Sequence, residues 1–280
     1  MIGFGVGLPG ETQQEGILHH GKMLDMLKAS WWYDWMDLVP EDRRYVPMVR
    51  RLWRDNFSDA FVLGQRDRTR YWFMGNEPDR KDQDDTTPEQ FAKNMKAWQA
   101  NVGSHIAVPG VLIDDGGIAW LDEFLRFSRL PVNMRWHIHI YANDGLEWTQ
   151  KWKRFQRWMV DNRFHSPVVV SETASMSTTV GNQLEVMTTA YNTLRSNKWL
   201  VGVGWFSAHY STFRREYERT DLFNKRGVIT VLGEWFQVFA KNAPTTLLPI
   251  ARTEVGEEEP ETHSGEAVSQ DESPLQSTPN

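Results

Sequence analysis

The sequence contains no cysteine, so neither disulfide bonds nor thiolate chemistry are available to it. No stretch approaches the roughly 18 consecutive apolar residues of a membrane-spanning helix. The first residues also lack the basic start and apolar core of a signal peptide. We therefore expect a soluble protein with no membrane partner, cytoplasmic as the chain stands, or secreted if a leader has been trimmed away.

The chain also lacks an excess of basic residues. Its net charge of −6 comes from the end of the chain, because residues 251–280 contain eight acidic residues and one arginine. The other 250 residues carry a net charge of +1. A neutral body argues against nucleic acid or an anionic membrane as partner and is compatible with a neutral polymer.

Short apolar runs alternate with helical segments along the chain. The expected strands number eight and lie at residues 2–8, 30–35, 45–49, 71–75, 105–112, 136–142, 167–173 and 201–208. Between them, apolar residues recur at helical spacing, and Thr87 and Pro88 are typical of a helix start. The alternation predicts the α/β class and a single (β/α)8 TIM barrel over residues 1–243.

The end of the chain and the glycines near its start also bear on the expected fold. Residues 244–280 are rich in Pro, Ser, Thr and Glu, and we expect them to form a disordered acidic tail. The rival fold, a doubly wound open sheet, usually carries a glycine-rich phosphate loop after its first strand. The glycines near the start of this chain lie within the expected strand instead, which favours the barrel.

Two of the expected strands end in a glutamate, Glu77 in one case and Glu172 in the other. The C-terminal ends of barrel strands meet at one rim, so two carboxylates 95 positions apart could share a site there. A pair of carboxylates is the minimum equipment for hydrolysing a glycosidic bond. Each could instead be a surface acid on a loop. That alternative is weaker for Glu77, which follows an apolar strand and precedes Pro78.

Another expected strand places His137, His139 and Tyr141 on one face. The two histidines could bind a metal ion in a metal-dependent hydrolase, with Asp114 or His209 as a further ligand. We favour a structural role for His137 in the barrel interior and expect no metal and no other cofactor. His139 and Tyr141, nearer the mouth, are candidates for binding sugar hydroxyls or a carboxylate.

Aromatic residues gather on two of the expected strands. The chain has fourteen tryptophans, and most aromatics in strands pack in a core. Tryptophan and tyrosine also combine a flat apolar face with a polar edge, which suits stacking on a sugar ring. We therefore expect Tyr33, Trp35, Trp205 and Phe206 to form the walls of a sugar cleft.

Taken in order, these motifs resemble the retaining (β/α)8 glycoside hydrolases of clan A. The narrower resemblance is to glycoside hydrolase family 128, whose characterised members cleave β-1,3-glucans. It is carried by residues 31–35 (WWYDW), residues 76–79 (NEPD), residues 139–141 (HIY) and residues 171–172 (SE). The chain departs from the family pattern at Asp34, where asparagine is usual, and in the Thr-Ala-Ser that follows residue 172.

The resemblance implies a retaining glycoside hydrolase with Glu77 as acid/base and Glu172 as nucleophile. It further implies that Asn76 holds the 2-hydroxyl of the substrate and that His139 and Tyr141 are active-site residues. The expected partner is an oligo- or polysaccharide, with β-1,3-glucan favoured, and we expect a monomer. The alternatives are a barrel that binds carbohydrate without catalysis and a metal-dependent hydrolase built on the two histidines.

Overall fold

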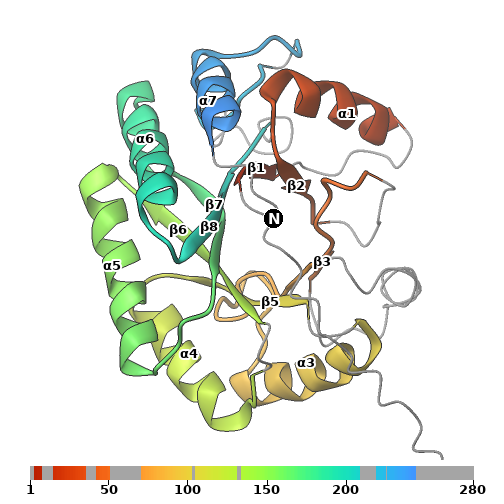
Figure 1. The fold of residues 1–280 in the computed structure, drawn as a ribbon, viewed down its shortest axis with the longest axis vertical. Coiled ribbons are helices and arrows are strands. Elements are labelled where there is room, and N and C mark those ends of the chain that lie inside the picture. The colour runs from red at the N-terminus through yellow and green to blue at the C-terminus, as the bar shows by residue number, and fades with distance from the viewer. Residues whose placement is uncertain are drawn as a thin grey trace, which may run out of the picture. The chain divides into compact units, whose positions relative to one another are not determined.

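The computed structural model describes residues 3–7, 15–35, 42–50, 71–102, 105–130, 134–208, 219–224 and 226–243. Within them, an eight-stranded parallel sheet is surrounded by helices, which confirms the predicted (β/α)8 class (Figure 1). The expected acidic tail at residues 244–280 and His209 lie outside the described residues. No helix in the described part of the chain is long and apolar enough to cross a membrane.

The sheet closes on itself. Its strands are β1 (Gly3–Gly7), β2 (Trp31–Tyr33), β3 (Met48–Val49), β4 (Trp72–Met74), β5 (Ile106–Leu112), β6 (Arg135–Ala142), β7 (Val168–Ser175) and β8 (Leu200–Trp205). The order is β2-β1-β8-β7-β6-β5-β4-β3, with every pair parallel. The two outer members of this order also meet, because Trp32 forms a parallel bridge with Tyr45 just before β3.

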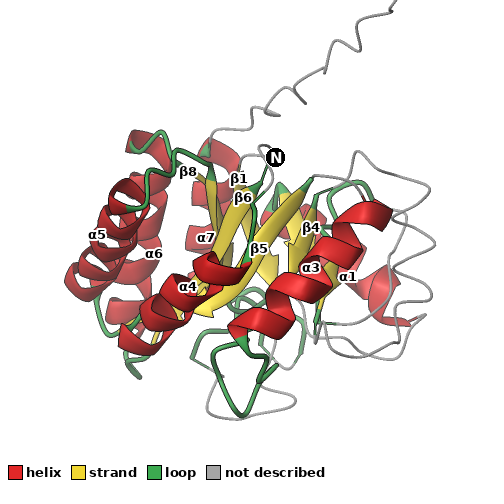
Figure 2. Cartoon of the chain, turned by 90° about the horizontal axis from the view of Figure 1, so that it is seen from below, coloured by secondary structure: helices red, strands yellow, loops and turns green. Residues whose placement is uncertain are grey.

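The helices lie outside the strands. They are α1 (Glu15–Leu27), α3 (Pro88–Val102), α4 (Asp115–Phe127), α5 (Gly145–Asp161), α6 (Val180–Ser196) and α7 (Val231–Asn242). Side chains that accept hydrogen bonds from first-turn backbone N–H groups start several of them, as Asp114 does for α4 and Thr179 for α6. Figure 2, turned by 90°, shows the strands in the middle with helices flanking them.

Alternation along each strand divides the core into two layers. A smaller cluster fills the barrel interior and includes Trp31, Tyr33 and Phe73. A larger cluster lies between strands and helices and includes Trp32 and Trp72. Neighbouring residues of one strand thus belong to different layers, because successive side chains point to opposite faces. This alternation decides which strand residues can reach the mouth of the barrel.

The strand ends differ from the predicted ones by a few residues. The difference that matters concerns β7, which was expected to stop at residue 173 and instead continues to Ser175. Glu172 therefore lies inside β7, paired in register with His139 of β6, and is not a residue that ends its strand. Glu77 does follow the last residue of β4 closely, as predicted.

Candidate active site

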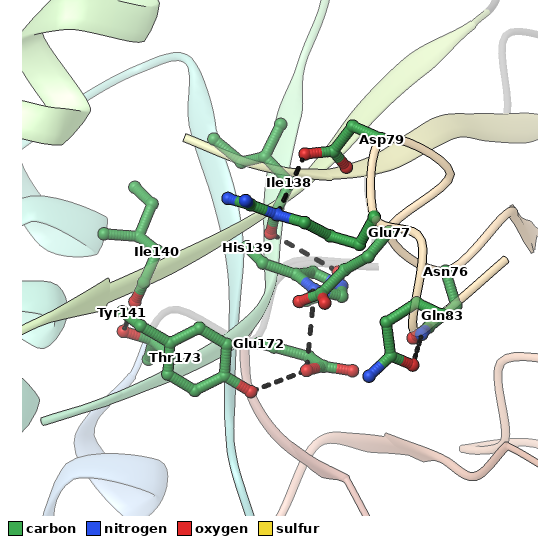
Figure 3. Close-up of polar contacts among 12 residues, drawn as sticks. Asn76, Glu77, Asp79, Gln83, Ile138, His139, Ile140, Tyr141, Glu172 and Thr173 are labelled. Carbon is green, nitrogen blue, oxygen red and sulfur yellow. Dashed lines mark hydrogen bonds and ion pairs between the residues drawn. The ribbon is translucent and has the colours of Figure 1, made fainter. Parts of the chain in front are cut away.

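Three side chains from different strands meet at the C-terminal rim of the barrel (Figure 3). One oxygen of Glu77, one oxygen of Glu172 and a ring nitrogen of His139 all lie within 4.8 Å of one another. His139 Nδ1 is 2.9 Å from Glu77 Oε1 and 3.5 Å from Glu172 Oε2. The fold therefore brings the two glutamates together, with an imidazole between them.

Glu172 is held by three hydrogen-bond donors. Its Oε1 accepts from the Tyr33 hydroxyl at 2.9 Å and from Trp35 Nε1 at 3.0 Å, and its Oε2 accepts from the Tyr141 hydroxyl at 2.6 Å. Burial, reinforced by the charge of Glu172, raises the pKa of both tyrosines well above the usual value. Both phenols therefore stay protonated and stabilise the Glu172 carboxylate as an anion.

Glu77 is aimed into the site by an unusual turn. Gly75 has φ +84° and Glu77 has φ +49°, a left-handed conformation that strains a residue with a Cβ. The turn is fixed by a hydrogen bond of 2.7 Å from the Glu77 N–H to the carbonyl of Gly110. A Cβ on Gly110 would lie 2.7 Å from the Gly75 carbonyl oxygen, so glycine permits this close approach.

His139 is set to carry charge although it is fully buried. Burial alone would lower its pKa, but the carboxylates of Glu172 and Glu77 outweigh burial and raise the pKa above the usual value. Glu77 Oε1 can accept whether the other oxygen of its carboxyl group is ionised or protonated, so His139 Nδ1 carries a proton and donates it to Glu77 Oε1. The proton on His139 Nδ1 therefore lies between the imidazole and Glu77 Oε1.

A further carboxyl group lies on the same loop. Burial raises the pKa of Asp79 to about 6, against the opposing charge of Arg80, whose Nε is 3.3 Å away. Arg80 also forms an ion pair with Asp114, the residue that caps α4. The loop that carries Glu77 is thus tied to the end of β5 by charge.

His137 has the structural role that the sequence favoured. It is fully buried and stacks on the Phe73 ring with 4.8 Å between centroids. Burial lowers its pKa to about 3, so it is neutral, with Nε2 donating to the Met74 carbonyl and Nδ1 accepting from Ser171. Both ring nitrogens are occupied, so His137 and His139 do not form a metal-binding pair.

The ligand-type atoms of Glu77, His139 and Glu172 are close enough together to hold a cation. However, His139 Nδ1 is the nitrogen that donates to Glu77, and both Glu172 oxygens already accept strong hydrogen bonds. Metal binding would require the imidazole to lose that proton and the carboxylate to give up these donors. The present hydrogen bonding suits proton transfer better than coordination.

Most of the other sequence-predicted residues lie around the same centre. Asn76 is buried and its Oδ1 accepts from Trp35 Nε1 at 3.1 Å. Phe206 meets Trp35 and Tyr141 edge-on, with ring centroids 5.5 and 5.8 Å apart. The peptide bond after Phe206 is cis. These aromatic side chains border the carboxylates on the side of β2, β6 and β8.

The prediction that Trp205 lines the sugar cleft is wrong. It is fully buried in the layer between strands and helices, and its indole N–H donates to the Thr220 carbonyl at 2.8 Å. Adjacent residues at the end of a strand face opposite ways, so Trp205 and Phe206 cannot both line the cleft. Trp205 is therefore a core residue and does not line the cleft.

Some residues of the site carried no sequence signal. Gln83 and Asp84 lie on the loop between β4 and α3, and both contact Asn76. Loop residues follow no periodic pattern, so only the fold reveals the contact. Asp34, the departure from the family pattern, is buried and accepts from the Tyr45 hydroxyl at 2.7 Å. Its carboxyl group is therefore bound within the protein.

Comparison with known proteins identifies the family. Residues 16–236 match the family model described as "Glycosyl hydrolase catalytic core". No curated protein sequence matches the chain.

Several solved structures share the fold, and the match to this chain covers nearly all of each of them. An exo-β-1,3-glucanase of family 128 from Aureobasidium namibiae has a TM-score of 0.65 and 18% identity, over 84% of this chain and 96% of that one. An endo-β-1,3-glucanase from Amycolatopsis mediterranei, solved with laminaritriose, has a TM-score of 0.64 and 21% identity, over 85% and 100%. An endo-β-1,3-glucanase from Lentinula edodes has a TM-score of 0.63 and 19% identity, over 84% and 98%.

Proposed function

Because the chain belongs to the glycosyl hydrolase catalytic-core family, we propose that it is a retaining β-1,3-glucanase that uses Glu172 as nucleophile and Glu77 as acid/base. The observation that carries the proposal is that one oxygen of Glu77 lies within 4.8 Å of one oxygen of Glu172. Retaining enzymes hold their carboxyl groups about 5–5.5 Å apart, whereas inverting enzymes leave about 6.5–9.5 Å for a water molecule. The short separation supports double displacement.

In the first step, an oxygen of Glu172 attacks the anomeric carbon as the bond to the leaving sugar breaks. Glu77, carrying a proton on the oxygen that does not face His139, gives that proton to the departing glycosidic oxygen. The donors from Tyr33, Trp35 and Tyr141 hold the Glu172 carboxylate in place for attack. The product of this step is a glycosyl ester of Glu172 and a free sugar hydroxyl.

In the second step, Glu77 acts as base. It removes a proton from water, the water oxygen attacks the anomeric carbon, and Glu172 leaves as a carboxylate. His139 Nδ1, which donates to Glu77, stabilises the Glu77 carboxylate in the interval when that group is ionised. The configuration at the anomeric carbon is inverted twice and therefore retained.

The choice of β-1,3-glucan rests on the relatives. The solved structures that share the fold are described as exo- or endo-β-1,3-glucanases, and one holds laminaritriose. The rim of this chain also offers what a glucosyl unit requires. Trp35, Tyr141 and Phe206 supply flat apolar walls, and Asn76 supplies an amide beside the nucleophile.

The test is hydrolysis of β-1,3-, β-1,4- and mixed-linkage glucans, with the anomeric configuration of the first product followed by NMR. We expect cleavage of the β-1,3-glucan with a β-product. Glu172→Gln should abolish turnover because it removes the nucleophile. Glu123→Gln, which changes an exposed glutamate on the outer helix α4, is the matched control and should leave turnover unchanged.

Each part of the proposal can fail separately. An α-product would exclude a retaining mechanism. Full activity of Glu172→Gln would exclude Glu172 as the nucleophile. Cleavage confined to another linkage would correct the substrate only. Binding of laminari-oligosaccharides without any hydrolysis would show a barrel that binds sugar and does not catalyse.

A further inference from the structure

The side chain of Asn76 is held at both ends of its amide. Its Oδ1 accepts from Trp35 Nε1 at 3.1 Å. Its Nδ2 donates to Gln83 Oε1 at 3.2 Å (Figure 3). Its backbone N–H donates to Asp84 Oδ2 at 2.7 Å. Asn76 is only 4% exposed, whereas its side-chain partners Trp35 and Gln83 are half-buried. Two consecutive loop residues thus bind Asn76: Gln83 binds the Asn76 side chain, and Asp84 binds the Asn76 backbone.

Both loop residues are held in turn by one arginine. Arg50 follows β3, the neighbouring strand, and its guanidinium reaches Gln83 Oε1 through Nη2 at 2.8 Å and Asp84 Oδ1 through Nε at 3.4 Å. The planar fork of arginine suits two acceptors side by side. We call Arg50, Gln83 and Asp84 the Asn76 bracket.

The bracket fixes which way the side-chain amides of Asn76 and Gln83 are turned. An indole N–H can only donate, so Trp35 requires the oxygen of Asn76 on its side. A guanidinium can only donate, so Arg50 requires the oxygen of Gln83 on its side. The Gln83 oxygen then faces the Asn76 nitrogen, as its acceptor. Every member of the chain of hydrogen bonds therefore has one permitted orientation.

Trp35 links the orientation of the Asn76 amide to the nucleophile. Its Nε1 is shared between Asn76 Oδ1 and Glu172 Oε1, at 3.1 and 3.0 Å. A flipped Asn76 amide would present N–H to the indole N–H, and the two donors would repel each other. The orientation of Asn76 thus matters for Trp35 and, through it, for Glu172.

We propose that the bracket positions Asn76 so that the second proton on its Nδ2 is directed to the substrate hydroxyl next to the reacting carbon. This inference rests on the proposed function, because that hydroxyl belongs to the glycosyl unit bound at Glu172. In the described residues, the Nδ2 atom makes one hydrogen bond to the protein, to Gln83, which leaves its other proton for a ligand. Arg50, Gln83 and Asp84 act through Asn76 and are positioning residues.

The kinetic test uses Arg50→Met and Gln83→Leu, neither of which can restore the lost hydrogen bonds. Hydrogen bonds at this hydroxyl strengthen in the transition state. We therefore expect kcat to fall by about 10- to 100-fold while KM changes little, since small displacements of positioning groups act on the chemical step. Gln83→Leu leaves the Arg50–Asp84 ion pair in place, so it remains informative if Arg50→Met folds poorly.

A double-mutant cycle separates positioning from general structural damage. In the Asn76→Ala background, Arg50→Met should have an effect below about 2-fold, because residues that act through one group are not additive. Arg44→Met is the matched control. Its side chain has nearly the same exposure, 32% against 29%, and it also pairs with two acceptors. We expect it to leave kcat unchanged. An equal effect of Arg50→Met in both backgrounds would overturn the proposal.

A second readout does not depend on any glucan. The side-chain amide protons of Asn76 can be identified by NMR as the signals lost in Asn76→Ala. They should shift in Arg50→Met and Gln83→Leu and stay in place in Arg44→Met. Unchanged signals in Arg50→Met would overturn the bracket. If wild type hydrolyses no glucan, the proposed function fails, and these signals still decide whether the bracket orients Asn76.

Discussion

The hydrogen bond from Tyr141 to Glu172 is the shortest of the three that hold the nucleophile, at 2.6 Å. Tyr141→Phe removes the hydroxyl and keeps the ring that packs against Phe206. The lost bond acts differently on the two steps of double displacement. It stabilises Glu172 as a free carboxylate, and that charge disappears in the first step and reappears in the second. The variant should therefore be impaired mainly in release of the sugar from Glu172.

The size of the effect follows from the charge on the acceptor. A hydrogen bond to an ionised group contributes about 1.5–3 kcal/mol, and about 1.4 kcal/mol corresponds to a factor of ten in rate. Only part of the charge has developed on the leaving carboxylate in the transition state. We therefore expect the second step to slow by about 10-fold in Tyr141→Phe, with Tyr33 and Trp35 still donating to the other oxygen.

The assay is rapid-mixing kinetics with a dinitrophenyl β-laminaribioside, whose leaving group needs no acid. Tyr141→Phe should give a burst of dinitrophenol followed by slow turnover, and the glycosyl-enzyme should be visible by mass spectrometry. Tyr191→Phe is the control, since that hydroxyl donates to a helix carbonyl, that of Asn242, at 3.2 Å. A Tyr141→Phe enzyme with wild-type turnover and no accumulated ester would refute the reasoning.

Three further outcomes are expected. Gly110→Ala should lower the free energy of unfolding by about 1–3 kcal/mol in urea titrations, because its Cβ would lie 2.6 Å from His137 Cε1, whereas Gly181→Ala, which meets nothing within 4 Å, should be neutral or stabilising. The pKa of His137 is lowered to about 3, so the unfolded chain takes up a proton that the folded protein does not, and the free energy of unfolding should fall by about 1.4 kcal/mol per pH unit from about pH 6.5 downward. His137→Gln should remove that share of the slope. Trp205→Phe should lower the melting temperature and leave KM for laminari-oligosaccharides unchanged, because the indole lies in the core.

The barrel could be predicted because its strands are short apolar runs separated by helices with clear periodicity. The start of α3 was foreseen at Pro88, where the cap and the first-turn proline signal it. Strand ends were less accurate, because burial continues past the apolar run. β7 extends beyond the predicted end at residue 173 through Ala174 and Ser175, and Ser175 has partners in Gln183 and the Asn143 carbonyl. Polar residues with internal partners look like loop residues in a sequence.

The centre of the site was also predictable, since Tyr33 and Trp35 share a strand face, as do His139 and Tyr141. The prediction for Trp205 was wrong because adjacent strand residues face opposite ways, and this indole faces the core between strands and helices. The Asn76 bracket could not be predicted. Its members come from the end of one strand and from an irregular loop, and the contacts depend on how that loop folds back.

The left-handed conformation of Glu77 bears on how the chain can change over evolutionary time. A non-glycine residue at φ +49° costs about 1–3 kcal/mol, and glycine in its place would relieve most of that strain. A barrel that only bound sugar would gain stability by giving up this side chain, and mutation would readily supply the replacement. A glutamate in that position is what a protein keeps when activity outweighs the stability it forgoes. The backbone of a single residue thus favours a working enzyme over an inactive relic.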